Sequence, residues 1–235
     1  WREPECFTVK AADEETDLYG VMWKPMDFDS TKRYPVIAYV YPGPWTEYIP
    51  LDFEFSSPSG APQLAQLGFV VVCFGNRGGS PYRGRDYHCY GYGNLRDYPL
   101  ADNKYGLEQL IARYSFIDGT KVGIFGHSGG GSMTVAAICT YPDFYKAAVA
   151  SSGNYDNTIF DYGWSEIHHG IKEVTKEGKV SFEFSIPVHL ELAKNLKGHL
   201  MLVTGDADDT VNPANTSRMV HSLILAGKDF ELVVL

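Results

Sequence analysis

The stretch KVGIFGHSGGGS, residues 121–132, places Ser128 among glycines in a pattern that suits nucleophilic catalysis. Its first half is apolar and predicts a buried strand, whereas its second half predicts a sharp turn and the start of a helix. Ser128 falls in that turn. A serine hydroxyl attacks carbonyl groups poorly unless a neighbouring base removes its proton. The stretch therefore predicts a nucleophile and raises the question of which histidine activates it.

Gly126, Ser128 and Gly130 match the pattern Gly-x-Ser-x-Gly, the nucleophile elbow of α/β-hydrolases. The elbow strains the backbone at the serine, and small neighbours are needed because the strand and the helix almost touch there. A phosphate-binding loop is the alternative, but the Gly-Lys-Ser/Thr ending of that loop is missing. The motif thus predicts that Ser128 is the catalytic nucleophile.

An acidic cluster follows the serine, as the chain order of a hydrolase triad requires. Asp206, Asp208 and Asp209 come directly after the apolar segment 198–205. A calcium loop is an alternative interpretation, but no glycine and glutamate follow at the required spacing. One of the three aspartates is therefore predicted to be the triad acid, and the other two are interpreted as solvated or helix-capping residues.

The elements that position these residues alternate along the chain. Six segments have the nearly continuous apolar composition of buried strands: 34–41, 69–74, 121–125, 145–153, 198–205 and 230–235. Helices are predicted among them at 61–68, 98–114, 130–141 and 212–227. This alternation predicts an α/β fold with a doubly wound, mostly parallel sheet. Ligands bind beyond the carboxyl ends of such strands, where both GHSGG and GDADD lie.

The remaining segments carry weaker signals. Residues 6–11 and 18–25 predict a hairpin at the sheet edge, and residues 154–190 are predicted to be irregular. Adjacent His168 and His169 point in different directions on a helix and have no third ligand nearby, so they are interpreted as surface or pocket-rim residues instead of metal ligands. Arg77, in the long loop 75–96, is predicted to order that loop by bonding backbone carbonyls.

Composition excludes several function classes. The 235 residues carry a net charge of −9 with no basic stretch, which argues against a nucleic acid or an anionic membrane as partner. The longest apolar run is far shorter than the roughly 20 residues of a membrane helix. The spacing of the four cysteines indicates neither a zinc site nor a disulfide scaffold.

The chain begins without methionine and ends within a predicted strand, so we expect residues 1–235 to be one C-terminally truncated α/β-hydrolase domain of a longer protein.

Five segments resemble the catalytic domain of the prolyl oligopeptidase family, and most closely its dipeptidyl-peptidase IV branch. They are YVYPGPW, NRGGSPYRGRDY, DYPLADNKYGLEQL, VGIFGHSGGGS and GDADDTV, in the order of that family. The family's acid loop reads Gly-x-Ala-Asp-Asp-x-Val, and the first aspartate of the pair is the triad acid. The resemblance therefore implies that Asp208 is the triad acid and that Asp209 has a structural role.

The resemblance also implies an oxyanion hole and a specificity pocket. YVYPGP is similar to the segment whose tyrosine hydroxyl completes the oxyanion hole, which implies Tyr41, with the backbone N–H of Gly129 as the second donor. The alternative for Tyr41 is an interior aromatic. Phe160 and Trp164 are implied as pocket aromatics, where the family usually has tyrosines, and Val211 as the pocket valine; core packing is the alternative for Phe160. Thr210 replaces the usual asparagine.

The implied activity is that of a serine peptidase that cleaves short peptides after Pro or Ala and releases N-terminal dipeptides, with no metal or cofactor. The resemblance implies a β-propeller upstream, a peptide as substrate and a periplasmic or secreted location, and it leaves a homodimer open. Two alternatives remain: an acylaminoacyl peptidase or esterase on the same fold, and a hydrolase-like binding or dimerisation domain without catalysis.

The catalytic histidine is not expected within this chain. Six of the seven histidines precede Asp208, and His221 is predicted to lie inside a helix. In the resembling family the base follows the acid by about 30 residues, just after the last of these strands. We therefore expect a histidine and a closing helix after Leu235, and negligible peptidase turnover by residues 1–235 alone.

Overall fold

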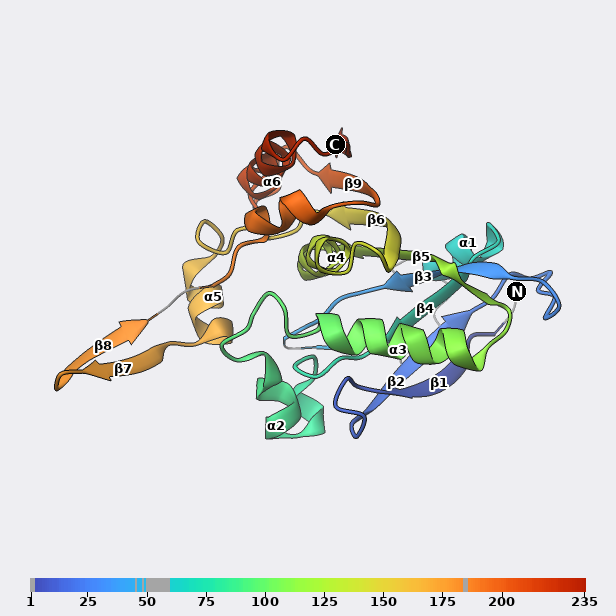
Figure 1. The fold of residues 1–235 in the computed structure, drawn as a ribbon, viewed down its shortest axis with the longest axis horizontal. Helices are drawn as coiled ribbons and strands as arrows, with labels where there is room; N and C mark the ends of the chain where they lie inside the picture. The colour runs from blue at the N-terminus through green and yellow to red at the C-terminus, as the bar shows by residue number, and fades with distance from the viewer. Residues whose placement is uncertain (1–2, 45, 48, 50–59, 184–185) are drawn as a thin grey trace.

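The computed structural model describes residues 3–44, 46–47, 49, 60–183 and 186–235. Its centre is an eight-stranded sheet of order β1-β2-β4-β3-β5-β6-β9-β10 (Figure 1). The strands are β1 (Glu5–Lys10), β2 (Asp17–Trp23), β3 (Tyr34–Tyr39), β4 (Val70–Phe74), β5 (Ile117–His127), β6 (Tyr145–Ser151), β9 (His199–Thr204) and β10 (Glu231–Val234). Pairs from β4 to β10 are parallel, while β1 and β2 are antiparallel to their neighbours. The predicted mostly parallel sheet with an edge hairpin is confirmed.

Helices cover both faces of this sheet. The helices of the described residues are α1 (Ala61–Gln66), α2 (Arg85–His88), α3 (Leu100–Arg113), α4 (Gly129–Thr140), α5 (Tyr162–His169) and α6 (Ala214–Leu225). The 3-10 turns are η1 (Pro81–Arg83), η2 (Cys89–Gly91) and η3 (His189–Asn195). α3 and α4 pack on one face, and α1 packs on the other. In the described ranges, none of the helices has both the length and the apolar surface that crossing a membrane requires.

Strand β4 shows why the central strands read as continuous apolar runs. Val70, Val72 and Phe74 point to the α3–α4 side, and Val71 and Cys73 point to the α1 side. Successive side chains of a strand alternate between faces, so a strand buried on both faces is apolar at every position.

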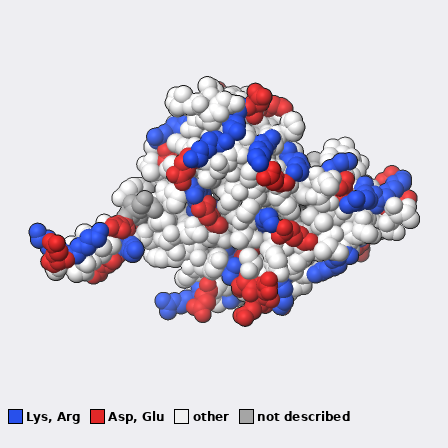
Figure 2. Space-filling model, viewed as in Figure 1, with Lys and Arg blue, Asp and Glu red and all other residues white. Residues whose placement is uncertain are grey.

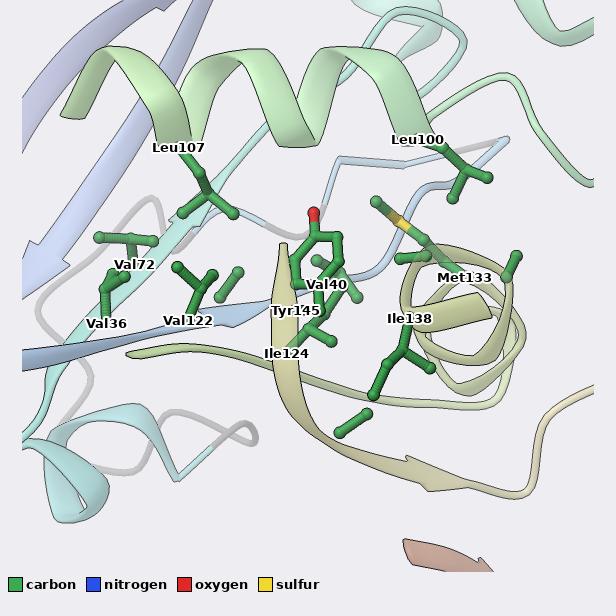
Figure 3. Packing of buried hydrophobic residues seen from close by; sticks show 14 of the residues in the cluster. Val36, Val40, Val72, Leu100, Leu107, Val122, Ile124, Met133, Ile138 and Tyr145 are labelled. Carbon is green, nitrogen blue, oxygen red and sulfur yellow. The ribbon is translucent and has the colours of Figure 1, made fainter. Parts of the chain in front are cut away.

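The core between the sheet and helices α3 and α4 is dense (Figure 3). Leu107 of α3 and Ile138 of α4 are fully buried there, and burial of such a side chain stabilises the fold by about 2 kcal/mol. Tyr145 is also fully buried, so its hydroxyl needs a partner. It donates to Oδ1 of Asn103 on α3, 2.9 Å away. This bond ties β6 to α3 and helps to hold the strands that carry the site.

The segment 154–190 is more regular than predicted. It contains α5 and a two-stranded hairpin, β7 (Lys172–Lys176) and β8 (Lys179–Glu183), which projects from the body of the molecule (Figure 1). Glu177 and Gly178 have φ of 52° and 74°, the left-handed pair of a type I′ turn. The hairpin carries charges of both signs (Figure 2). The prediction was wrong because neither strand has a buried face to leave an apolar pattern.

Candidate active site

Ser128 lies between β5 and α4 in a strained turn. Its φ and ψ are 56° and −121°, a conformation that costs a residue with a side chain about 1–3 kcal/mol. The Ser128 N–H donates to the carbonyl of Ser151, 2.8 Å away, which holds the turn against β6. A Cβ on Gly126 would lie 2.6 Å from the carbonyl oxygen of Val40, and a Cβ on Gly130 would overlap the same oxygen. The glycines are therefore required by space, as an elbow demands.

Asp208 lies at the same edge of the sheet as Ser128. His127, Ser151 and Val203 are in register across β5, β6 and β9, so the residues that follow these strands emerge side by side. The N–H groups of Val211 and Thr210 donate to Oδ1 of Asp208, at 2.9 and 3.0 Å. The Val211 N–H in particular holds the pKa of this carboxyl below its ordinary value of 3.8, so the group is an anion at neutral pH.

Tyr41 follows β3, the neighbour of β5, and its ring reaches the first turn of α4. A Cβ placed on Gly129 would be 3.8 Å from Cζ of Tyr41, the atom that carries the hydroxyl. The next residue is anchored, since the carbonyl of Pro42 accepts hydrogen bonds from the Tyr98 hydroxyl at 3.0 Å and from Nδ2 of Asn76 at 3.2 Å. The phenol thus lies next to the backbone that would supply the second oxyanion donor.

A small cavity lies beside Gly129, and one of the three residues implied to form the specificity pocket lines it. Trp164 lines it, together with residues of the loop before α3 and of the segment after β6. Phe160 does not line it but packs edge-on against Trp164, with ring centroids 5.4 Å apart. Val211 is buried at the end of the acid loop and is also outside the lining.

Sequence reasoning missed polar residues of this lining, among them Ser132, Asn154 and Asn157. The signal for the two asparagines was their position directly after β6, at the carboxyl end of a central strand. Ser132 lies one helical turn after Ser128, and this spacing was the only sequence signal that it faces the site.

The histidines near the site contact groups other than the Ser128 hydroxyl or lie exposed on the surface. Nδ1 of His127 lies 3.0 Å from the Ser151 hydroxyl, and His221 is exposed on α6. His168 packs on Trp164 with centroids 4.9 Å apart, while Nδ1 of His169 accepts the Leu95 N–H. Both histidines thus contact residues that line the cavity, Trp164 and Leu95.

No hydrogen bond joins a histidine to the Ser128 hydroxyl in the part of the chain that the structure describes. The described residues also include no group of three His, Cys, Asp or Glu side chains arranged to hold a metal ion.

The comparisons decide the family. The model of the prolyl oligopeptidase family matches residues 55–235. The chain belongs to this family. It is 30% identical to dipeptidyl peptidase 8 of Homo sapiens over 231 residues, which is 98% of this chain and 25% of that protein, and the protein of the same name from Mus musculus matches equally. This prolyl oligopeptidase family chain thus spans about a quarter of the length of these curated relatives.

Solved structures of longer chains contain the same fold. A structure from Bacteroides ovatus superimposes with a TM-score of 0.88 at 30% identity, over 99% of this chain and 32% of the other. The dipeptidyl peptidase 4 of Porphyromonas gingivalis superimposes with a TM-score of 0.84 at 26% identity, over 98% and 31% of the two chains. The chain described here is therefore an α/β-hydrolase domain of the dipeptidyl-peptidase IV type.

Proposed function

We propose that this chain is the catalytic domain of a serine peptidase that releases N-terminal dipeptides after Pro or Ala. The observation that carries the proposal is the backbone of Ser128, which has a strained, left-handed φ at the carboxyl end of β5, as a nucleophile elbow requires. The ionised acid at Asp208 and the phenol of Tyr41 lie at the same edge. A binding domain has no use for all three, which disfavours the non-catalytic alternative.

The proposed chemistry is acyl transfer in two steps. The Ser128 Oγ forms a bond to the peptide carbonyl carbon and loses its proton to a histidine base, which then protonates the departing amine as the C–N bond breaks. The Gly129 N–H and the Tyr41 hydroxyl stabilise the negative charge on the carbonyl oxygen, which develops only in the transition state. Water then hydrolyses the ester, and Asp208 stabilises the charged imidazole in both steps.

The base is proposed to come from outside these 235 residues, because among the described residues no histidine bonds the Ser128 hydroxyl. A groove on the α1 side of the sheet supports the proposal that a further helix packs there. It is lined largely by apolar residues of β5, β6 and β9, and Val149 in it is 42% exposed. Exposed apolar surface of this kind marks a place where another segment packs.

We propose that a β-propeller precedes the domain, as the resemblance implies.

The full-length protein tests the function directly. We expect it to release 4-nitroaniline from Gly-Pro and Gly-Ala 4-nitroanilides and to leave the N-acetylated forms uncleaved. Cleavage of the acetylated forms alone would favour the acylaminoacyl peptidase alternative, and hydrolysis of 4-nitrophenyl acetate alone would favour the esterase. No hydrolysis of any of these substrates would contradict the proposal.

Replacing Tyr41 with phenylalanine removes one proposed oxyanion donor and leaves the ring in place. In the full-length protein we expect kcat to fall by about a hundredfold with little change in KM, because the hydroxyl acts on charge that appears only in the transition state. Steady-state kinetics on Gly-Pro 4-nitroanilide measures both constants. A rise in KM at unchanged kcat would instead show that Tyr41 binds the substrate.

Replacing Trp164 with alanine removes one wall of the cavity. We expect a loss of about 2 kcal/mol of transition-state binding, or roughly thirtyfold in kcat/KM for a proline substrate. Tyr162→Ala is the matched control, since Tyr162 is on the same helix but 66% exposed. Equal kinetics of the two variants would remove Trp164 from the pocket.

A further inference from the structure

Among the described residues, the β7–β8 hairpin has no third strand beside it. β8 pairs with β7 only, and β7 pairs with β8 only. Val180 and Phe182 of β8 lie on the same face of the hairpin and are 57% and 67% exposed, although both are apolar. A two-stranded hairpin is marginally stable in water by itself and is stabilised by further strands. Because the hairpin projects from the body of the molecule (Figure 1), another strand can reach its edge.

The outer edge of β8 offers backbone groups at Val180 and Phe182. The two-residue turn joins Lys176 to Lys179, and from this hydrogen-bonded pair onward, bonded and non-bonded pairs alternate along the hairpin. Lys179 and Ser181 therefore bond to β7, whereas the N–H and C=O groups of Val180 and Phe182 point away from it. No other described strand takes up these groups. Such an edge is a template for pairing with another strand.

The sequence of β8, KVSFE, is complementary to itself in the antiparallel direction. When β8 of a second copy lies alongside with the two Ser181 residues opposite each other, Lys179 faces the partner's Glu183. Val180 then faces the partner's Phe182, and the outward backbone groups of these two residues meet, as a hydrogen-bonded pair requires. Opposite charges and an aromatic beside a β-branched residue are both favourable across strands. The two-fold symmetry forms each of these pairs twice.

Other registers and the edge of β7 lack this complementarity. A shift of β8 by two residues places Lys179 or Glu183 opposite Ser181, which removes both ion pairs. On β7, the same symmetric pairing would bring Lys172 opposite the partner's Lys176, and like charges there are destabilising. Glu183 lies 4.0 Å from Lys176 of its own hairpin, but its side chain is 55% exposed, so it remains accessible to a second lysine.

We infer that β8 is a self-association surface, through which two copies of this chain pair about a two-fold axis and form a continuous sheet of order β7-β8-β8-β7. A contact that uses the same surface on both copies closes after two, so it gives a dimer and not a filament. The contact area is small, so the dimer is weak. The inference does not depend on the proposed function, because no residue of the candidate active site takes part.

Disulfide formation between the two copies tests the pairing in the full-length protein. Ser181 faces its own copy in a non-hydrogen-bonded pair, where the Cα atoms are about 4.5 Å apart and a disulfide can form. With oxidised glutathione, we expect Ser181→Cys to give a disulfide-linked dimer about tenfold faster than Thr175→Cys, the matched exposed position on β7. Wild type measures the background from the exposed Cys6 and Cys89.

Charge reversal tests the register and separates this surface from any other dimer contact. In the Ser181→Cys protein, Glu183→Lys places lysine opposite lysine in both pairs, and we expect cross-linking to slow by about tenfold. Adding Lys179→Glu exchanges the two charges and should restore the rate. Glu173→Lys, which makes the same charge change on β7, is the control and should leave the rate unchanged. A dimer that uses another surface would respond to none of these changes.

Three results would overturn the inference. The first is equal cross-linking of Ser181→Cys and Thr175→Cys, which indicates random collision. The second is a cross-linking rate that Glu183→Lys leaves unchanged. The third is a new thiol in Ser181→Cys that neither cross-links nor reacts with a small thiol reagent, because another part of the full-length chain then covers the edge. All substituted positions are exposed, and circular dichroism checks that each variant folds.

Discussion

Ser128→Ala in the full-length protein is expected to lower kcat for Gly-Pro 4-nitroanilide by about six powers of ten. Without the hydroxyl no acyl-enzyme forms, and the residual rate comes only from binding and the oxyanion donors. Ser217→Ala, at an exposed position on α6, is the control and should retain wild-type turnover. Turnover by Ser128→Ala within tenfold of wild type would exclude Ser128 as the nucleophile.

A separate measurement of stability shows whether a Ser128 variant has lost its chemistry or its fold. The left-handed φ of Ser128 penalises any residue with a Cβ, whereas glycine adopts it freely. We therefore expect Ser128→Gly to be more stable than Ser128→Ala by about 1 kcal/mol in urea unfolding of residues 1–235, although both are inactive. Equal stability of the two variants would show that the turn is unstrained.

The isolated 235-residue chain is expected to hydrolyse Gly-Pro 4-nitroanilide no faster than the Ser128→Ala variant of the same chain. The reason is the placement of its histidines, because His127 faces Ser151, His189 is buried against two carbonyls and His221 is exposed on α6. The loss of one triad member costs several powers of ten in rate. Hydrolysis that His221→Ala abolishes would contradict this and make His221 the base.

The parts of the site that could be predicted are those with a strong local signal. The elbow follows from a buried strand, a serine and the glycines Gly126 and Gly130, whose steric contacts show that only glycine fits. The sheet follows from apolar runs such as 70–74, which reflect burial on both faces. In both cases the same residues that form the local structure carry the pattern.

The partners of Arg77 and the polar lining of the cavity could not be predicted, because they depend on contacts between segments far apart in the chain. Arg77 was predicted to bond backbone carbonyls, but its guanidinium binds the carboxylates of Asp102, at 2.7 Å, and Asp13, at 3.0 Å. Nothing near Arg77 in the sequence identifies those partners. Likewise, Asn154 and Asn157 come from a segment without periodicity, so only the folded chain shows that they lie beside Gly129.

The β7–β8 hairpin has a practical consequence for handling the protein. Within the described ranges, the hydrogen bonds and ion pairs of residues 172–183 all stay inside the hairpin. Its tip, Glu177–Gly178, is exposed and lies away from the sheet (Figure 1). Exposed turns of this kind accept inserted sequence well. A fluorophore-binding or affinity tag between these two residues would therefore serve for labelling or immobilisation while leaving Ser128 and its cavity free.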